Sequence, residues 1–146
     1  QEPISIQDSE DEYPIEVIGS GQTRVVIYMP DEWYTGTGDC IAKIQWDPHH
    51  RQNSREIDIW DNANGRMAGL LAPILDWSEM DQWLIMPEAE TYRSLNAKEA
   101  GDIVRSLESK LKDMGVRTTD IRRGNIGRIE GRDVVIDYGS MKPEQW

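Results

Sequence analysis

The sequence predicts an α+β fold in which a β-rich first part is followed by a helix and a terminal β-hairpin. Short runs of β-branched and other apolar residues, separated by turn-forming residues, occupy the chain up to Pro87. Beyond Pro87, apolar residues recur at intervals of three and four, as they do on one face of a helix. Two further apolar runs, 126–129 and 133–136, flank a Glu-Gly-Arg sequence that suits a hairpin connection.

Five strands and one helix are expected in the first part. The expected strands are 15–18, 24–29, 40–46, 70–75 and 83–86. Glycines at 19 and 21 provide a turn between the first two runs. Asp47 is a suitable N-cap and is followed by proline, so we expect a helix from there to Asn62. Together these elements predict a five-stranded antiparallel sheet that carries one helix.

The clearest periodicity predicts a helix from Ala97 to Met114. The apolar residues with this spacing are Ala100, Ile103, Val104, Leu107, Leu111 and Met114. Asn96 with Glu99 three residues later resembles a capping box, with Asn in place of the usual Ser or Thr. Gly115 is a suitable end of the helix, because glycine readily adopts the left-handed conformation found there.

Length and composition fit one compact domain. The 146 residues are 38% hydrophobic and 29% charged. The longest nearly uninterrupted apolar stretch, 67–75, is too short to span a bilayer, so we expect no membrane association. Residues 1–13 are polar and acidic and are expected to be a flexible tail before a single domain at 14–146. The single cysteine, Cys40, indicates a reducing compartment, and we expect a cytoplasmic protein.

The charge of the chain argues against direct binding to nucleic acid. The formal net charge is −11, whereas neutralising phosphates requires clustered Lys and Arg. The main basic concentration consists of Arg117, Arg122, Arg123, Arg128 and Arg132. An acidic protein with one basic cleft suits an anionic small ligand. Alternatively, the acidity only aids solubility or reflects a salty host.

One series of polar residues has the chemistry of phosphoryl transfer. Asp120 is followed five residues later by Asn125 and, after the predicted hairpin, by Asp137 in an Asp-Tyr-Gly sequence. Phosphoryl transfer needs a carboxylate facing the attacking hydroxyl and oxygen ligands that hold magnesium on the phosphates. Taken separately, these residues are common turn formers. Their joint order is what indicates phosphate chemistry.

In this order of residues the chain resembles the protein-kinase-like superfamily. The resemblance is to its compact small-molecule phosphotransferases and to the small kinase-like proteins of tailed phages. It implies a minimal kinase-like fold, with a β-rich lobe at about 14–87 and a reduced helical lobe at about 88–146. A phage-encoded protein of this kind would act in the host cytoplasm.

The resemblance also implies roles for individual residues. Asp120 matches the catalytic aspartate that orients or deprotonates the acceptor, and Arg122 stands where a basic residue approaches the transferred phosphate. Asn125 and Asp137 match the two magnesium ligands. Threonines at 118–119 replace the pair that normally precedes the catalytic aspartate, so the scaffold that orients Asp120 is altered.

Two upstream segments extend the resemblance. Gly19 and Gly21 resemble the glycine loop over the phosphates, although Arg24 occupies the place of the third glycine. Residues 41–44 resemble the strand motif whose lysine, here Lys43, points into the nucleotide cleft. The alternative for Lys43 is a solvent-facing position on a half-buried strand.

The resemblance assigns two more residues to the nucleotide site. Glu56, in the predicted helix, is the expected ionic partner of Lys43, with Asp58 as the alternative. Met86 lies where the last strand of a kinase small lobe enters the hinge that meets an adenine ring. Its alternative is a place in the apolar core, the commoner use of methionine.

Two functions from different classes are compatible with the sequence. The first is a minimal kinase-like domain that binds ATP and magnesium, with or without transfer of phosphate to an acceptor. The second is a non-catalytic pseudokinase-like module that binds a host or virion protein. The sequence ends seven residues after Gly139, which leaves no substrate platform and favours the second. The four residues that match the nucleotide and metal site favour the first.

Overall fold

The computed structural model describes residues 4–8, 11–20, 24–31, 33, 38–47, 49–90, 96–118 and 121–143. Over these residues the protein is a mixed α+β fold with an antiparallel sheet and a separate hairpin, so the predicted fold class is confirmed at this level. The chain divides into two compact units. The first contains Gln1–Asn53 and Ile74–Glu88, and the second contains Ser54–Pro73 and Ala89–Trp146.

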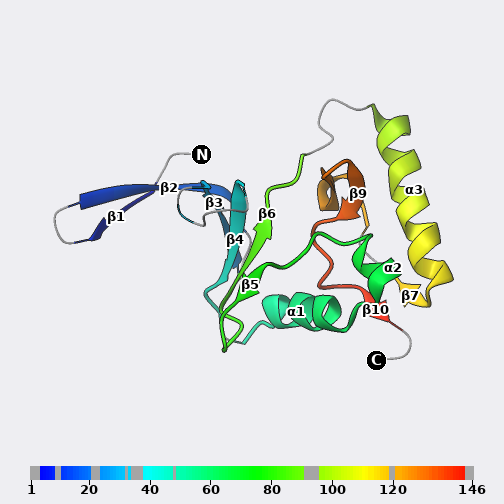
Figure 1. The fold of residues 1–146 in the computed structure, drawn as a ribbon, viewed down its shortest axis with the longest axis horizontal. Coiled ribbons are helices and arrows are strands. Elements are labelled where there is room, and N and C mark those ends of the chain that lie inside the picture. The colour runs from blue at the N-terminus through cyan, green and yellow to red at the C-terminus, as the bar shows by residue number, and fades with distance from the viewer. Residues whose placement is uncertain are drawn as a thin grey trace. The chain divides into compact units, whose positions relative to one another are not determined.

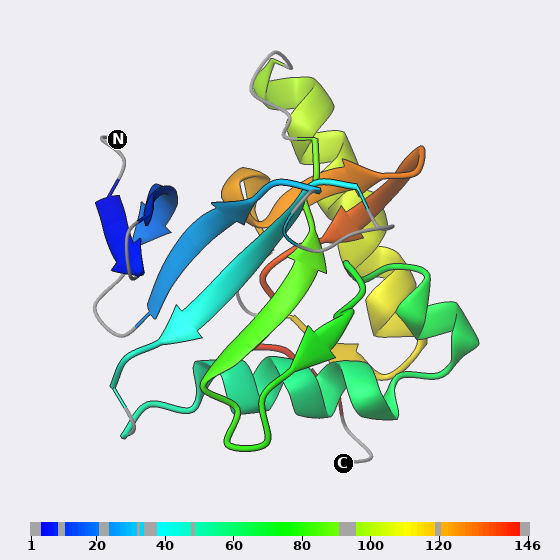
Figure 2. The same cartoon turned by 60° about the vertical axis from the view of Figure 1, so that its left-hand side comes forward.

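The first unit is built on an antiparallel sheet with the strand order β1-β2-β3-β4-β6-β5. Its strands are β1 (Ile4–Asp8), β2 (Asp11–Ser20), β3 (Arg24–Met29), β4 (Cys40–Gln45), β5 (Asp76–Trp77) and β6 (Trp83–Pro87). Figure 2 shows β3, β4 and β6 side by side. The described sheet therefore has six strands, where the sequence predicted five.

One face of this sheet is apolar. Ala42 on β4 lies opposite Ile27 on β3 and Ile85 on β6, and directly opposed residues share a face. The members of the cluster on this face are Cys40, Ala42 and Ile85, with Ile27, Met29 and Trp83 packed against them. Because side chains alternate along a strand, Lys43 and Met86 project to the opposite face.

β1 and the start of β2 fall in the segment expected to be a flexible tail. Ile4 lies opposite Ile15 and Asp8 opposite Asp11, so the two strands form an antiparallel pair. The tail was predicted from acidic composition, which reports how little apolar surface a segment can bury. Composition does not report the backbone N–H and C=O groups, which pair here in an antiparallel ladder.

The strand predicted at 70–75 is wrong. A short helix, α2 (Gly65–Ala68), ends just before this run, and the Oδ1 of its N-cap Asn64 accepts a hydrogen bond from the backbone N–H of Met67. Leu71 then makes an isolated parallel bridge with Val135, and the short strand β5 follows further along. The apolar run is thus buried against a distant segment, which its own pattern could not indicate.

The two predicted helices are present. α1 (Gln52–Asn62) ends at the predicted residue but begins at Gln52, so the predicted N-cap at Asp47 is wrong. α3 (Ala97–Asp113) matches the prediction to within one residue. The Oδ1 of Asn96 accepts from the backbone N–H of Glu99, and the Nδ2 donates to the Glu99 carboxylate, both at 2.8 Å. Gly115 has φ +77°, so the predicted helix start and end are confirmed.

The predicted hairpin is β8 (Ile126–Ile129) with β9 (Arg132–Val135). Its two-residue turn has positive φ at both Glu130 (52°) and Gly131 (77°), as a type I′ turn requires. In the second unit α3 contacts β9, and both are labelled in Figure 1. Fully buried residues of this unit include Leu71, Leu107, Leu111, Ile126, Val134, Val135 and Tyr138.

Candidate functional site

The pairing of β8 (Ile126–Ile129) with β9 (Arg132–Val135) places the backbones of the two predicted magnesium ligands, Asn125 and Asp137, near one another. The short 3-10 helix η1 (Arg123–Asn125) leads directly into β8, and one residue, Ile136, separates Asp137 from the end of β9. The N–H of Ile136 donates to the carbonyl oxygen of Asn125 at 2.8 Å, so the Asn125 backbone lies across from the residue before Asp137. Asn125 is buried and Asp137 is half-buried. The open end of the hairpin therefore carries one amide and one carboxylate.

A short ladder closes the segment that contains these residues. β7 (Val116–Arg117) pairs antiparallel with β10 (Lys142–Pro143), a pairing that the sequence did not predict. Arg117 lies opposite Lys142, and Val116 opposite Pro143. The chain between the two strands is thereby held at both ends. All the residues assigned to catalysis and metal binding by the kinase resemblance lie within this closed segment.

Tyr138 anchors the residue next to Asp137. Its hydroxyl donates to the backbone oxygen of Ala72 at 2.9 Å, and its side chain is fully buried. Burial and, to a lesser extent, the negative charge of Glu56 raise the pKa of Tyr138 far above its ordinary value. The phenol therefore stays protonated and remains a donor. The sequence showed only an aromatic residue after Asp137, because the acceptor lies 66 residues away.

In the first unit, Lys43 and Met86 belong to one face of the sheet. Lys43 on β4 lies opposite Leu84 on β6, and Ile41 lies opposite Met86. Residues two apart on a strand share a face, so Lys43 and Met86 project to the same side. Their exposed fractions are 4% and 1%, which contradicts the alternative that Lys43 is a solvent-facing lysine.

A buried amide that sequence reasoning missed, Asn53, connects several segments of the first unit. Asn53, fully buried at the start of α1, accepts from the guanidinium of Arg24 at 3.0 Å. Its Nδ2 donates to the backbone oxygen of Lys43 at 3.0 Å and to that of Gln82 at 3.3 Å. Its N–H also donates to the side chain of Gln45. Arg24, in the place of the third loop glycine, thus has its guanidinium bonded inside the unit.

The other predicted site residues are distributed as follows. Gly19 lies on β2 opposite Val26, next to a shift in register. Arg122 is exposed at the start of η1, and Glu56 is fully buried in the part of α1 that belongs to the second unit. Asp120 and Gly21 lie outside the described residues. The ion pair between Lys43 of the first unit and Glu56 of the second remains a prediction.

The described part of the chain has neither a cluster of metal-ligating side chains nor a helix that could span a membrane. Within the residues at 4–8, 11–20, 24–31, 33, 38–47, 49–90, 96–118 and 121–143, no three His, Cys, Asp or Glu side chains form a cluster that could hold a metal. A magnesium site with one carboxylate, one amide oxygen and nucleotide phosphates is not a cluster of that kind. No helix among the same residues has the length and apolar character needed to cross a membrane.

The sequence matches no protein-family model, and it has no significant match among curated proteins. The arguments for function below therefore come from the residues of this chain and from the kinase resemblance of its motifs.

Proposed function

We propose that the chain is a minimal kinase-like domain that binds ATP together with magnesium. The supporting observation is the register of the β8–β9 hairpin, which sets the Asn125 backbone opposite the residue before Asp137. Amide and carboxylate oxygens are the hard ligands that magnesium prefers, and the metal completes its shell with water and phosphate. The side chains present therefore fit the ion that the resemblance implies.

The buried face of the first unit supports the nucleotide part of the proposal. Lys43 and Met86 project to the same face of the sheet, where Lys43 is 4% exposed. By the kinase resemblance, the lysine at this position would contact the nucleotide phosphates. Met86, on the same face, would contribute apolar surface for a base. Asp120 would orient an acceptor hydroxyl, and Arg122 would approach the phosphate that is transferred.

Thermal-shift titration with ATP, with and without magnesium, tests this proposal. A ligand that binds only the folded state at a hundredfold excess over its dissociation constant adds about 2.7 kcal/mol to the free energy of unfolding. Asp137→Ala should lose the magnesium-dependent part of this gain. Asp61→Ala, which removes an exposed carboxylate of α1, is the matched control and should gain as much as the parent.

If the parent gains nothing from millimolar ATP and magnesium, nucleotide binding is wrong. The same holds if Asp137→Ala gains as much as Asp61→Ala. The second function, a non-catalytic pseudokinase-like module that binds a protein, would then replace the first.

A further inference from the structure

A groove of about 490 Å³ lies within the second unit, along the C-terminal half of α3 and the residues that follow it. Three cationic side chains line it, Arg105, Lys112 and Arg117, together with one carboxylate, Glu108. The chain as a whole carries a formal charge of −11. The groove is therefore a local concentration of positive charge on an acidic protein.

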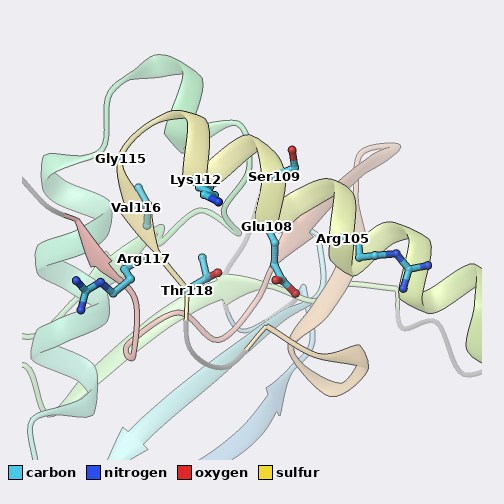
Figure 3. A pocket seen from close by; sticks show the side chains of 8 residues that line it. All are labelled: Arg105, Glu108, Ser109, Lys112, Gly115, Val116, Arg117 and Thr118. Carbon is cyan, nitrogen blue, oxygen red and sulfur yellow. The ribbon is translucent and has the colours of Figure 1, made fainter.

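Two of the three cations have no ion-pair partner among the described residues. Arg105 makes an ion pair with Asp102, one turn earlier on α3. Lys112 and Arg117 are exposed, and neither has an ion pair with another residue of the described ranges. Figure 3 shows Arg105 and Arg117 at opposite ends of the row of labelled side chains, with Glu108 and Thr118 between them.

The length of the groove favours an elongated ligand over a single small anion. Its lining runs along α3 from Arg105 to Lys112, seven residues, which at 1.5 Å per residue is about 10 Å. An extended peptide advances about 3.3 Å per residue and so covers this length in about three residues. One phosphate group would reach only one end of the groove. Ser109 and Thr118 add hydroxyl groups that can bond to a peptide backbone.

We propose that this groove binds an extended acidic segment of a partner protein, with carboxylates directed at Lys112 and Arg117. Charge complementarity selects an acidic peptide, and the hydroxyl groups suit its backbone. A nucleic acid is disfavoured because its continuous negative charge would be repelled by the remaining surface of the protein. This inference does not depend on nucleotide binding.

Fluorescence anisotropy of the full chain with synthetic peptides tests the proposal. The probe is a labelled peptide of alternating Glu and Ser, and its control is a peptide of alternating Gln and Ser. Binding is expected for the Glu peptide alone and should weaken as salt screens the charges. Replacing both Lys112 and Arg117 with Glu should raise Kd by at least about tenfold, because two attractions become repulsions.

The matched control is Lys98→Glu with Lys110→Glu, which makes the same change of net charge on α3 outside the groove. It should raise Kd by much less than the groove variant does, because neither side chain lines the groove. If the groove variant does not fold, Lys112→Gln with Arg117→Gln replaces it. ATP and magnesium should stabilise the groove variant as they do the parent, which separates this test from that of the proposed function.

Three results would overturn the proposal: no binding of the Glu peptide at low salt, an equal loss of affinity in the control variant, or equal binding of the Gln peptide. Tighter binding of a single-stranded oligonucleotide, lost in the same groove variant, would also overturn it in favour of a nucleic-acid site.

Discussion

Replacing Gly127 with alanine should destabilise the second unit, because β8 has no room for a β-carbon there. An added Cβ would lie 2.8 Å from the Cβ of Ala89, 3.0 Å from the backbone oxygen of Glu90 and 3.3 Å from the Cγ2 of Ile136. Carbon atoms in contact prefer about 3.5–4.0 Å. Glu90 cannot shift freely, since its N–H and C=O bond the backbone of Arg128 in both directions at 2.9 Å.

The expected magnitude is the difference between opposing contributions. Overpacking costs about 1–3 kcal/mol, and each hydrogen bond of the bridge to Glu90 would add about 0.5–1.5 kcal/mol if the strain breaks it. Alanine also reduces the entropy of the unfolded chain, which favours folding by about 0.4–1 kcal/mol. We expect a net loss of about 1–3 kcal/mol in the free energy of unfolding.

Urea unfolding followed by tryptophan fluorescence measures this loss as a lower midpoint at constant slope. The matched control is Gly65→Ala in α2, where an added Cβ meets nothing within 4 Å. That variant should equal or exceed the parent in stability, since the entropy of the unfolded chain is the main contribution left. If Gly127→Ala is as stable as Gly65→Ala, the close approach of the 89–90 segment to β8 is refuted.

Two further predictions concern buried hydrogen bonds. Tyr138→Phe leaves the buried backbone oxygen of Ala72 without its phenolic donor and should cost about 1–3 kcal/mol in urea unfolding. Burial and Glu56 raise the folded-state pKa of Tyr138, so the stability it contributes is fully present below the unfolded pKa near 10 and falls as the pH rises above it. Tyr138→Phe should lose this alkaline decline; a decline equal to the parent's would contradict the assignment. Asn53→Ala removes the acceptor of the Arg24 guanidinium and two donations to backbone oxygens, and should lower the free energy of unfolding by about 2–4 kcal/mol. An unchanged urea midpoint would show that this network contributes nothing.

The candidate site could be predicted in part. The sequence predicted a hairpin with Asn125 before it and Asp137 after it. The register of β8 with β9 sets the backbones of these two residues near one another. The face shared by Lys43 and Met86 follows from strand alternation once the pairing of β4 with β6 is known. Tyr138 and Asn53 were missed as structural donors and acceptors, because no local pattern marks a partner that is distant in sequence.

The elements that the sequence by itself determined are those with local causes. α3 follows from its apolar period, the Asn96 cap and the Gly115 end, all within one segment. The β8–β9 hairpin follows from a Glu-Gly-Arg sequence in which glycine accepts positive φ, although the structure places Arg132 in β9 and leaves a two-residue turn. In such cases the side-chain and backbone preferences of neighbouring residues are sufficient to predict the element, because all of these residues lie in one short segment of the sequence.

Only the tertiary structure decided which distant segments pair. The run at 70–75 has the composition of a strand, yet Leu71 bridges Val135 and the adjoining chain forms α2. β7 and β10 are two residues each, which is too short for an alternation of apolar and polar residues to show. They pair because the fold of the segment between them brings its two ends together. Such pairings depend on the entropy of closing the loop and on the packing of the whole unit. The sequence of either segment alone therefore does not predict them.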